Sequence, residues 1–384
     1  MNFRINLEDI RFISGVLLTL LLSKHCKLRK GLFPLLCSAA IVYITFDLRL
    51  ALYVFTSYAF NILLLFTFRF NEYVFTVINF AILYIFKIKG KSIDPNIGGT
   101  YDVSGILMLT TIKMCYLGRD FDRKKHSLLE VIGYLTFIPG LIMGPTPTFK
   151  QYQEREEKDP GNISWTLLGR SLIFLLTFKL VFDNYFPISL LYKNDVGILH
   201  QLFNLYGFNL GQRLRFYFAW NFTEACYALQ GFDDMKNIDF FKVEFATSIK
   251  DLSQGWNIKT NVWLKECFFE KLKHKSVFFA SLMTFLVSAL WHGINAGYAN
   301  MFLSFGISIP IVRSVNKFIM TYMGVAFPVL SRIQMVFFIM YFSSPFFILD
   351  LKKTFITWKN VYFYGHFYCF ICCALFLLPK MFKN

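Results

Sequence analysis

An imidazole and a side-chain amide are the two groups in this 384-residue chain whose surroundings suggest chemistry. His292 interrupts the stretch from Ser276 to Val312, which carries no formal charge. An ionisable group at membrane depth is expensive and is by default a functional candidate, although a satisfied imidazole that packs a helix junction remains the alternative. Asn257 lies 35 residues before His292, in the block WNIKTNVWLK.

These two groups suffice for acyl transfer from an activated donor such as a thioester. A hydroxyl acceptor needs only a base that removes its proton, and the oxyanion that forms needs a hydrogen-bond donor. The sequence has no GxSxG elbow, P-loop or HExxH pair, which removes support for hydrolases with a nucleophile relay, NTPases and metalloproteases. The eight cysteines are scattered, so neither a disulfide framework nor a metal site is expected.

The block around Asn257 has the period of a helix. Four of its residues should share one polar face, namely Asn257, Thr260, Asn261 and Leu264. Trp256 and Trp263 flank that face. Lys259 and Lys265 could reach lipid headgroups or a phosphorylated ligand. The alternative is an interfacial helix with Trp anchors and solvated amides.

Composition indicates a membrane protein. The chain is 55% hydrophobic and 17% charged, with a mean hydropathy of +0.47, whereas soluble domains have about 45–50% apolar and about 25% charged residues. The chain has a net charge of +16, and its basic residues occur in short clusters between apolar runs. This distribution is typical of positive-inside membrane topology and of binding to anionic lipid headgroups, and it argues against binding to nucleic acid. The clearest clusters are Lys24, Lys27, Arg29 and Lys30; Lys87, Lys89 and Lys91; and Arg119, Arg123, Lys124 and Lys125.

The apolar runs predict an all-α polytopic membrane protein with about ten or eleven transmembrane and re-entrant helices around an intramembrane catalytic chamber. The run between Arg11 and Lys24 predicts a half-helix or interfacial helix rather than a signal peptide. Residues 232–275 should form an amphipathic surface segment. Residues 276–312 should form two passes that turn at WHGINAG. We expect a single domain over 1–384.

Four blocks resemble those of a known family. WNIKTNVWLK resembles its Trp-Asn block, and LVSALWHGINAGYANMF its Trp-His-Gly block. RFYFAWNFTEACYALQGFD resembles its aromatic-Trp-Glu-Ala block, and FIPGLIMGPTPTFKQY its Gly-Pro-aromatic block. The four blocks occur in the same order as in the membrane-bound O-acyltransferase family. WNIKTNVWLK is similar to the Trp-Asn block of that family's lysophospholipid acyltransferase branch. The likeness covers Tyr101 to about Val312.

This resemblance implies an acyl-CoA-dependent lysophospholipid acyltransferase, multi-pass, in the endoplasmic reticulum, with a role in phospholipid remodelling. It implies that His292 is the general base and that Asn257 is the catalytic amide. It also implies that acyl-CoA is the co-substrate and that membrane lipids surround the protein. No cofactor, metal or nucleic acid is expected. Tyr298 could hydrogen-bond near the site, Glu224 could position a neighbour, and His366 could line the acceptor side. Further expected substrate-binding residues are Trp256, Lys259, Thr260, Asn261, Trp263, Lys265 and Trp291.

Other readings remain open at this point. The acceptor could be another lipid or a protein. A lipid transporter or scramblase would also need an irregular bundle with one buried ionisable residue, but it would not need the pair of Asn257 and His292. These motifs do not encode the headgroup, the acyl chain, the sn position or the oligomeric state. For the substrates the reason is that one methylene changes the binding free energy by only about 1–3 kcal/mol.

Overall fold

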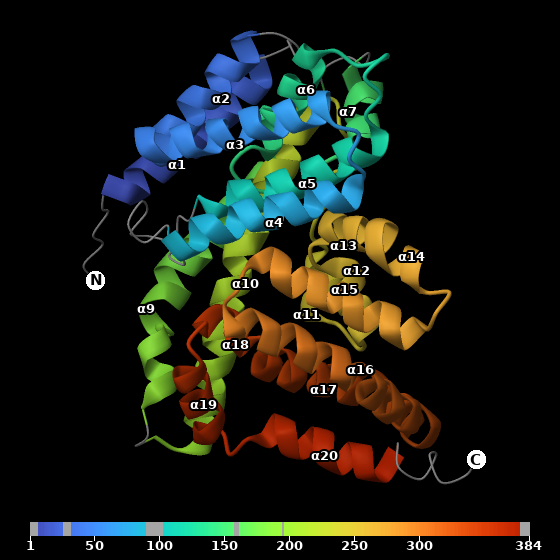
Figure 1. Ribbon diagram of the computed structural model, residues 1–384. Coiled ribbons are helices and arrows are strands. Elements are labelled where there is room, and N and C mark those ends of the chain that lie inside the picture. The colour runs from blue at the N-terminus through green and yellow to red at the C-terminus, as the bar shows by residue number, and fades with distance from the viewer. Residues whose placement is uncertain (1–6, 26–31, 90–102, 157–160, 194–195, 377–384) are drawn as a thin grey trace. The chain divides into compact units, whose positions relative to one another are not determined.

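The computed structural model describes residues 7–25, 32–89, 103–156, 161–193 and 196–376 (Figure 1). Helices are the regular elements of these ranges, and the one strand-type pairing within them is an isolated bridge between Ile238 and Trp256. The all-α expectation is confirmed. The chain divides into two compact units, one of Met1–Gly169 with Ala219–Asn237, the other of Arg170–Phe218 with Ile238–Asn384. The expectation of a single domain stays a prediction.

Several residues named above lie outside the described ranges: Lys27, Arg29, Lys30, Lys91 and Tyr101.

The first unit is a helical assembly. Its helices are α1 (Leu7–His25), α2 (Leu32–Thr45), α3 (Leu48–Thr67), α4 (Glu72–Lys89), α5 (Ser104–Asp120), α6 (Leu128–Leu135) and α7 (Phe149–Glu156). Helices α4 and α5 run side by side (Figure 1). Asp47 starts α3 by accepting a hydrogen bond from the Leu50 N–H at 2.8 Å. Ser127 and Glu130 form a capping box at the start of α6.

Helices α3 and α4 are joined by a pair of buried amides. Asn61 donates to Asn79 Oδ1 at 3.1 Å, and Asn79 donates back to Asn61 Oδ1 at 2.8 Å. Each amide also donates to the carbonyl four residues earlier in its own helix. All four N–H donors are therefore used, which is what burial of an amide among apolar helices requires.

Helices also make up the carboxyl-terminal part of the second unit. They are α15 (Val277–His292), α16 (Ala296–Met323), α17 (Phe327–Phe342), α18 (Ser344–Ile348), α19 (Leu351–Asn360) and α20 (Tyr364–Phe376). Helix α16 packs against α15, α17, α18 and α20. The buried core between these helices includes Phe305, Phe338 and Tyr341. Two helices cross the boundary between the units: α8 (Trp165–Thr177) and α10 (Ile198–Leu229).

Residues 232–275 form a series of short helices. They are α11 (Phe240–Glu244), α12 (Ile249–Gly255), α13 (Ile258–Leu264), a π-helical turn (Lys265–Phe269) and α14 (Glu270–Leu272). Side chains begin the first two of them, because Asp239 accepts from the Lys242 N–H and Ser248 from the Asp251 N–H. The position of this segment at a membrane surface stays a prediction.

Three helical stretches in the described ranges are long and apolar enough to cross a membrane: Leu48–Thr67, Trp165–Tyr192 and Ala296–Ile348. Shorter apolar helices span Leu32–Thr45, Val277–His292 and Tyr364–Leu375. A membrane protein is therefore supported, while the expected ten or eleven transmembrane and re-entrant helices stay a prediction. The expected turn inside residues 276–312 is present, since α15 ends at His292 and α16 begins at Ala296.

Candidate active site

His292 is the last residue of α15, and the chain breaks directly after it. Gly293 has φ 123° and ψ −177°, a backbone conformation that L side chains rarely adopt. Its N–H still donates to the carbonyls of Ala289 and Leu290. Asn295 then starts α16 by accepting from the Gly297 N–H at 2.8 Å. The glycine therefore places the imidazole at a helix end, as the Trp-His-Gly block predicted.

Aromatic rings surround the imidazole of His292. Phe302 stacks on it with the ring centroids 5.4 Å apart, and Phe346 meets it edge-on at 4.8 Å. Tyr298 lies 5.4 Å away. These rings come from α16 and α18, so two segments distant in sequence enclose the half-buried imidazole. Enclosure by these rings limits the access of water to the imidazole.

Asn257 does not lie on the predicted helix face. It precedes α13 and has φ 48° and ψ 51°, the left-handed conformation that asparagine tolerates better than most residues. The predicted stripe is therefore wrong at its first position, because the chain turns at Asn257 before the helix begins. The backbone carbonyl of Asn257 accepts from the Asn261 N–H at 3.0 Å.

Asn261 stabilises this turn. Its side-chain amide donates to the carbonyl of Ser253 at 2.9 Å and to that of Trp256 at 2.7 Å. Both donors of Asn261 are thus used by the backbone. The expectation that this residue binds substrate stays a prediction. Its neighbour Thr260 is buried in α13.

Two tryptophans join the Trp-Asn block to the Trp-His-Gly block. Helix α13 packs against α15, and the ring centroids of Trp263 and Trp291 lie 6.0 Å apart. Trp291 in turn contacts the ring of His292 at 4.8 Å. Trp263 is fully buried, and its indole N–H has no hydrogen-bond partner among the described residues. The structure therefore brings these two blocks together.

The remaining predicted residues are in different settings. Lys259 is half-buried, whereas Lys265 is exposed. The imidazole of His366 makes a hydrogen bond with the Tyr341 hydroxyl at 2.6 Å and packs edge-on against Trp358. This cluster shares none of its rings with the group around His292, so the structure gives His366 partners of its own. No group of three or more His, Cys, Asp or Glu in the described part of the chain could hold a metal ion.

The other two sequence blocks contact each other in the first unit, which also contains the half-buried Glu224. The Tyr227 hydroxyl in α10 donates to the carbonyl of Pro145 at 2.9 Å. A Cβ atom on Gly140 would lie 2.1 Å from that hydroxyl oxygen, so only glycine fits there. The Gly-Pro-aromatic block is therefore a fixed loop that rests on the carboxyl end of α10.

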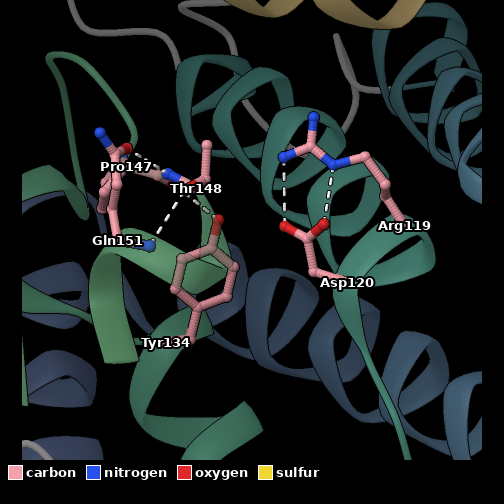
Figure 2. A network of polar contacts seen from close by, with 6 residues as sticks. All are labelled: Arg119, Asp120, Tyr134, Pro147, Thr148 and Gln151. Carbon is pink, nitrogen blue, oxygen red and sulfur yellow. Dashed lines mark hydrogen bonds and ion pairs between the residues drawn. The ribbon is translucent and has the colours of Figure 1, made fainter. Parts of the chain in front are cut away.

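Figure 2 shows how the end of this loop is held. The Tyr134 hydroxyl donates to the carbonyl of Pro147 at 2.7 Å. Thr148 and Gln151 exchange two hydrogen bonds of 3.0 Å that begin α7. The same view contains the ion pair of Arg119 and Asp120 at the end of α5.

Lys113 is a buried ionisable residue that the sequence reasoning missed. It is 1% exposed in α5, and its ammonium group donates to the carbonyl of Leu135 at 2.8 Å. Burial lowers the pKa of Lys113 to about 7. The available signal was a single lysine within GILMLTTIKMCYL, because buried lysines are rare without a specific partner.

The free energy of unfolding should depend on pH through Lys113. Between pH 7 and about 10 the unfolded chain binds this proton more strongly than the folded chain, so stability should rise with pH by up to roughly 1.4 kcal/mol per unit. We expect the melting temperature of the wild type, measured in detergent, to rise as the pH increases from 7 to 9. The melting temperature of Lys113→Met should rise less over the same range. Lys150→Met removes an exposed lysine and serves as control. A difference that is constant with pH would contradict the assignment.

Comparison with known proteins places most of the chain in one group. The sequence model of MBOAT, the membrane-bound O-acyltransferase family, matches residues 55–350. The mouse protein named membrane-bound glycerophospholipid O-acyltransferase 1 is 28% identical, over 73% of this chain and 69% of its own length. The lysophospholipid acyltransferase of Schizosaccharomyces pombe is 27% identical, over 67% of this chain and 59% of its own length.

A third relative differs in the acceptor that its name gives. It is the membrane-bound acylglycerophosphatidylinositol O-acyltransferase of Xenopus laevis, 26% identical over 66% of this chain and 64% of its own length. The chain thus spans about three fifths to two thirds of these relatives. Of the three names, only the third gives a headgroup, and all three agree on the transfer of an acyl group to a lipid.

Proposed function

Because the chain belongs to the membrane-bound O-acyltransferase family, we propose that it transfers a fatty acyl chain from acyl-CoA to the free glycerol hydroxyl of a lysophospholipid. The observation that carries this proposal is the contact between the Trp-Asn and Trp-His-Gly blocks, made by Trp263 and Trp291 beside the enclosed imidazole of His292. The names of the relatives support the lipid acceptor. A role in phospholipid remodelling and residence in the endoplasmic reticulum are part of the same proposal.

In this reaction His292 acts as general base. Its imidazole takes the proton of the glycerol hydroxyl while that oxygen attacks the thioester carbonyl carbon. The amide of Asn257 donates a hydrogen bond to the developing oxyanion or orients the attacking hydroxyl. The carbon–sulfur bond then breaks, and the CoA thiolate takes the proton from the imidazolium. No acyl-enzyme, cofactor or metal is needed in this scheme.

The surroundings of the two residues suit these substrates. The rings of Phe302 and Phe346 keep water from a thioester that would otherwise hydrolyse. Lys259, half-buried on α13, would bind a phosphate of CoA, and the exposed Lys265 would bind a more peripheral one. The donor phosphates would thus bind at the same helix that follows Asn257.

The proposal is tested by release of free CoA from purified protein in detergent. An unsaturated acyl-CoA is supplied with a panel of lysophospholipids that differ in headgroup, and with other lipid acceptors. Release that depends on a lysophospholipid supports the proposal and identifies the preferred headgroup. Release with another lipid alone assigns a different acceptor. Folded protein that binds no acyl-CoA and releases none contradicts the proposed activity and favours lipid transport.

A further inference from the structure

A buried ion pair lies one helical segment away from Asn257, within the same unit. Arg213 of α10 binds both carboxylate oxygens of Glu244 at the end of α11, with distances of 2.7 and 2.8 Å. The Tyr217 hydroxyl, one turn further along α10, donates to the same carboxylate. Arg213 and Tyr217 are buried. Burial alone would raise the pKa of Glu244, but the charge and hydrogen bonds of Arg213 lower it below its usual value.

This ion pair is connected to Trp256, the residue before Asn257. The rings of Phe216 and Tyr217 contact the indole of Trp256 edge-on, with centroids 5.5 and 6.0 Å apart. The Asp239 N–H, which precedes α11, donates to the carbonyl of Gly255 at 2.8 Å. Helices α11 and α12 also pack together. Glu244 therefore anchors to α10 the same short segment that carries Trp256.

Asn257 needs such support, because its backbone is in a conformation that non-glycine residues rarely hold. A left-handed residue persists where its surroundings determine its geometry, and such residues often occur at functional sites. Charged, bidentate hydrogen bonds have a narrow geometry and are the stronger kind. The hydrogen bonds of the ion pair join α10 to α11, so its role in the reaction would be indirect, through the segment that carries Trp256.

We infer that Glu244, Arg213 and Tyr217 are positioning residues that hold Trp256 and thereby fix the placement of the Asn257 amide. This inference rests on the proposed function, since it requires Asn257 to act in acyl transfer. Displacement of a catalytic group by about 1 Å costs up to about 10²-fold in rate. The positioning residues should therefore affect kcat much more than KM.

The experiment is a double-mutant cycle on the full chain, measured by CoA release at saturating acyl-CoA and lysophospholipid. Glu244→Gln and Tyr217→Phe are made alone and together with Asn257→Ala. We expect kcat to fall about 10- to 100-fold for Glu244→Gln and about 3- to 10-fold for Tyr217→Phe, with KM changed less than about threefold. In the Asn257→Ala background neither substitution should lower kcat further, because the residue that they position is absent.

Tyr364→Phe is the matched control. Like Tyr217→Phe, this substitution removes a tyrosine hydroxyl that donates a hydrogen bond, here to the carbonyl of Phe337 at 2.7 Å. Tyr364 is far from Trp256 in the sequence. Its kcat should equal that of the wild type. If Glu244→Gln does not fold, Tyr217→Phe decides, since it keeps both the ion pair and the ring that contacts Trp256.

The outcomes separate this inference from the proposed function. An equal fold-loss in the wild-type and Asn257→Ala backgrounds would overturn the inference alone, because the ion pair would then act independently of Asn257. Unchanged kcat in Tyr217→Phe and Glu244→Gln would overturn it as well. Wild-type turnover in Asn257→Ala would overturn both the proposed role of Asn257 and the inference built on it.

Discussion

Purified protein with His292 replaced by alanine is expected to release CoA about 10² to 10⁴-fold more slowly than the wild type. The reason is that His292 is the proposed base and that its imidazole lies among the rings of Tyr298, Phe302 and Phe346. Without a base, the glycerol hydroxyl must attack while it retains its proton. The measurement is initial CoA release at saturating acyl-CoA with the preferred lysophospholipid.

His292→Asn separates the base from its packing. Asparagine occupies part of the space of the imidazole and can hydrogen-bond, but it does not accept a proton near pH 7. We expect it to be as slow as His292→Ala. His126→Ala is the control, since this imidazole accepts from the Asp122 N–H at 2.9 Å in the other unit. Folded His292→Asn protein with wild-type turnover would show that the imidazole only packs the helix junction.

The helix break beside His292 could be predicted because its signals are local. A glycine directly after the histidine and an asparagine two residues later are a helix stop and a helix start in sequence. The enclosure of His292 was only partly predictable. Tyr298 lies in the first turn of the next helix, whereas Phe346 lies in α18 and is one of 48 phenylalanines in the chain. No periodicity distinguishes that ring from those that face lipid.

For Asn257 the sequence pattern predicted the wrong local geometry. The spacing of Asn257, Thr260 and Asn261 fits a helix face, but helical spacing does not reveal where a helix begins. The start is set by hydrogen bonds that the pattern does not contain, here those of the Asn261 amide to the carbonyls of Ser253 and Trp256.

The ion pair of Arg213 and Glu244 was not predictable for another reason. Its members are 31 residues apart, and Glu244 occurs in a segment with many other charges. Sequence alone gives no preference for one partner over another. Lys113 is an intermediate case, since its apolar surroundings were visible in sequence, whereas its partner, the carbonyl of Leu135, depends on how α5 meets α6.

Replacing Asn257 is expected to have the second largest effect on turnover. Loss of one hydrogen-bond donor to an oxyanion costs about 2.7–4 kcal/mol in the barrier, or about 10² to 10³ in kcat. Asn257→Ala removes the amide and also places a residue with a Cβ at φ 48°, which strains the backbone. Its effect alone cannot be divided between the amide and the turn.

Asn257→Gly makes that division, because glycine adopts the left-handed conformation without a steric penalty and lacks the amide. If the amide acts on the reacting atoms, Asn257→Gly and Asn257→Ala should both lose about 10² to 10³ in kcat, and the alanine variant should melt at a lower temperature. Asn257→Asp keeps the tolerance for this conformation but replaces the donor by a negative charge, so it should be at least as slow. Near-wild-type turnover in Asn257→Gly would mean that the turn, and not the amide, is what the reaction needs.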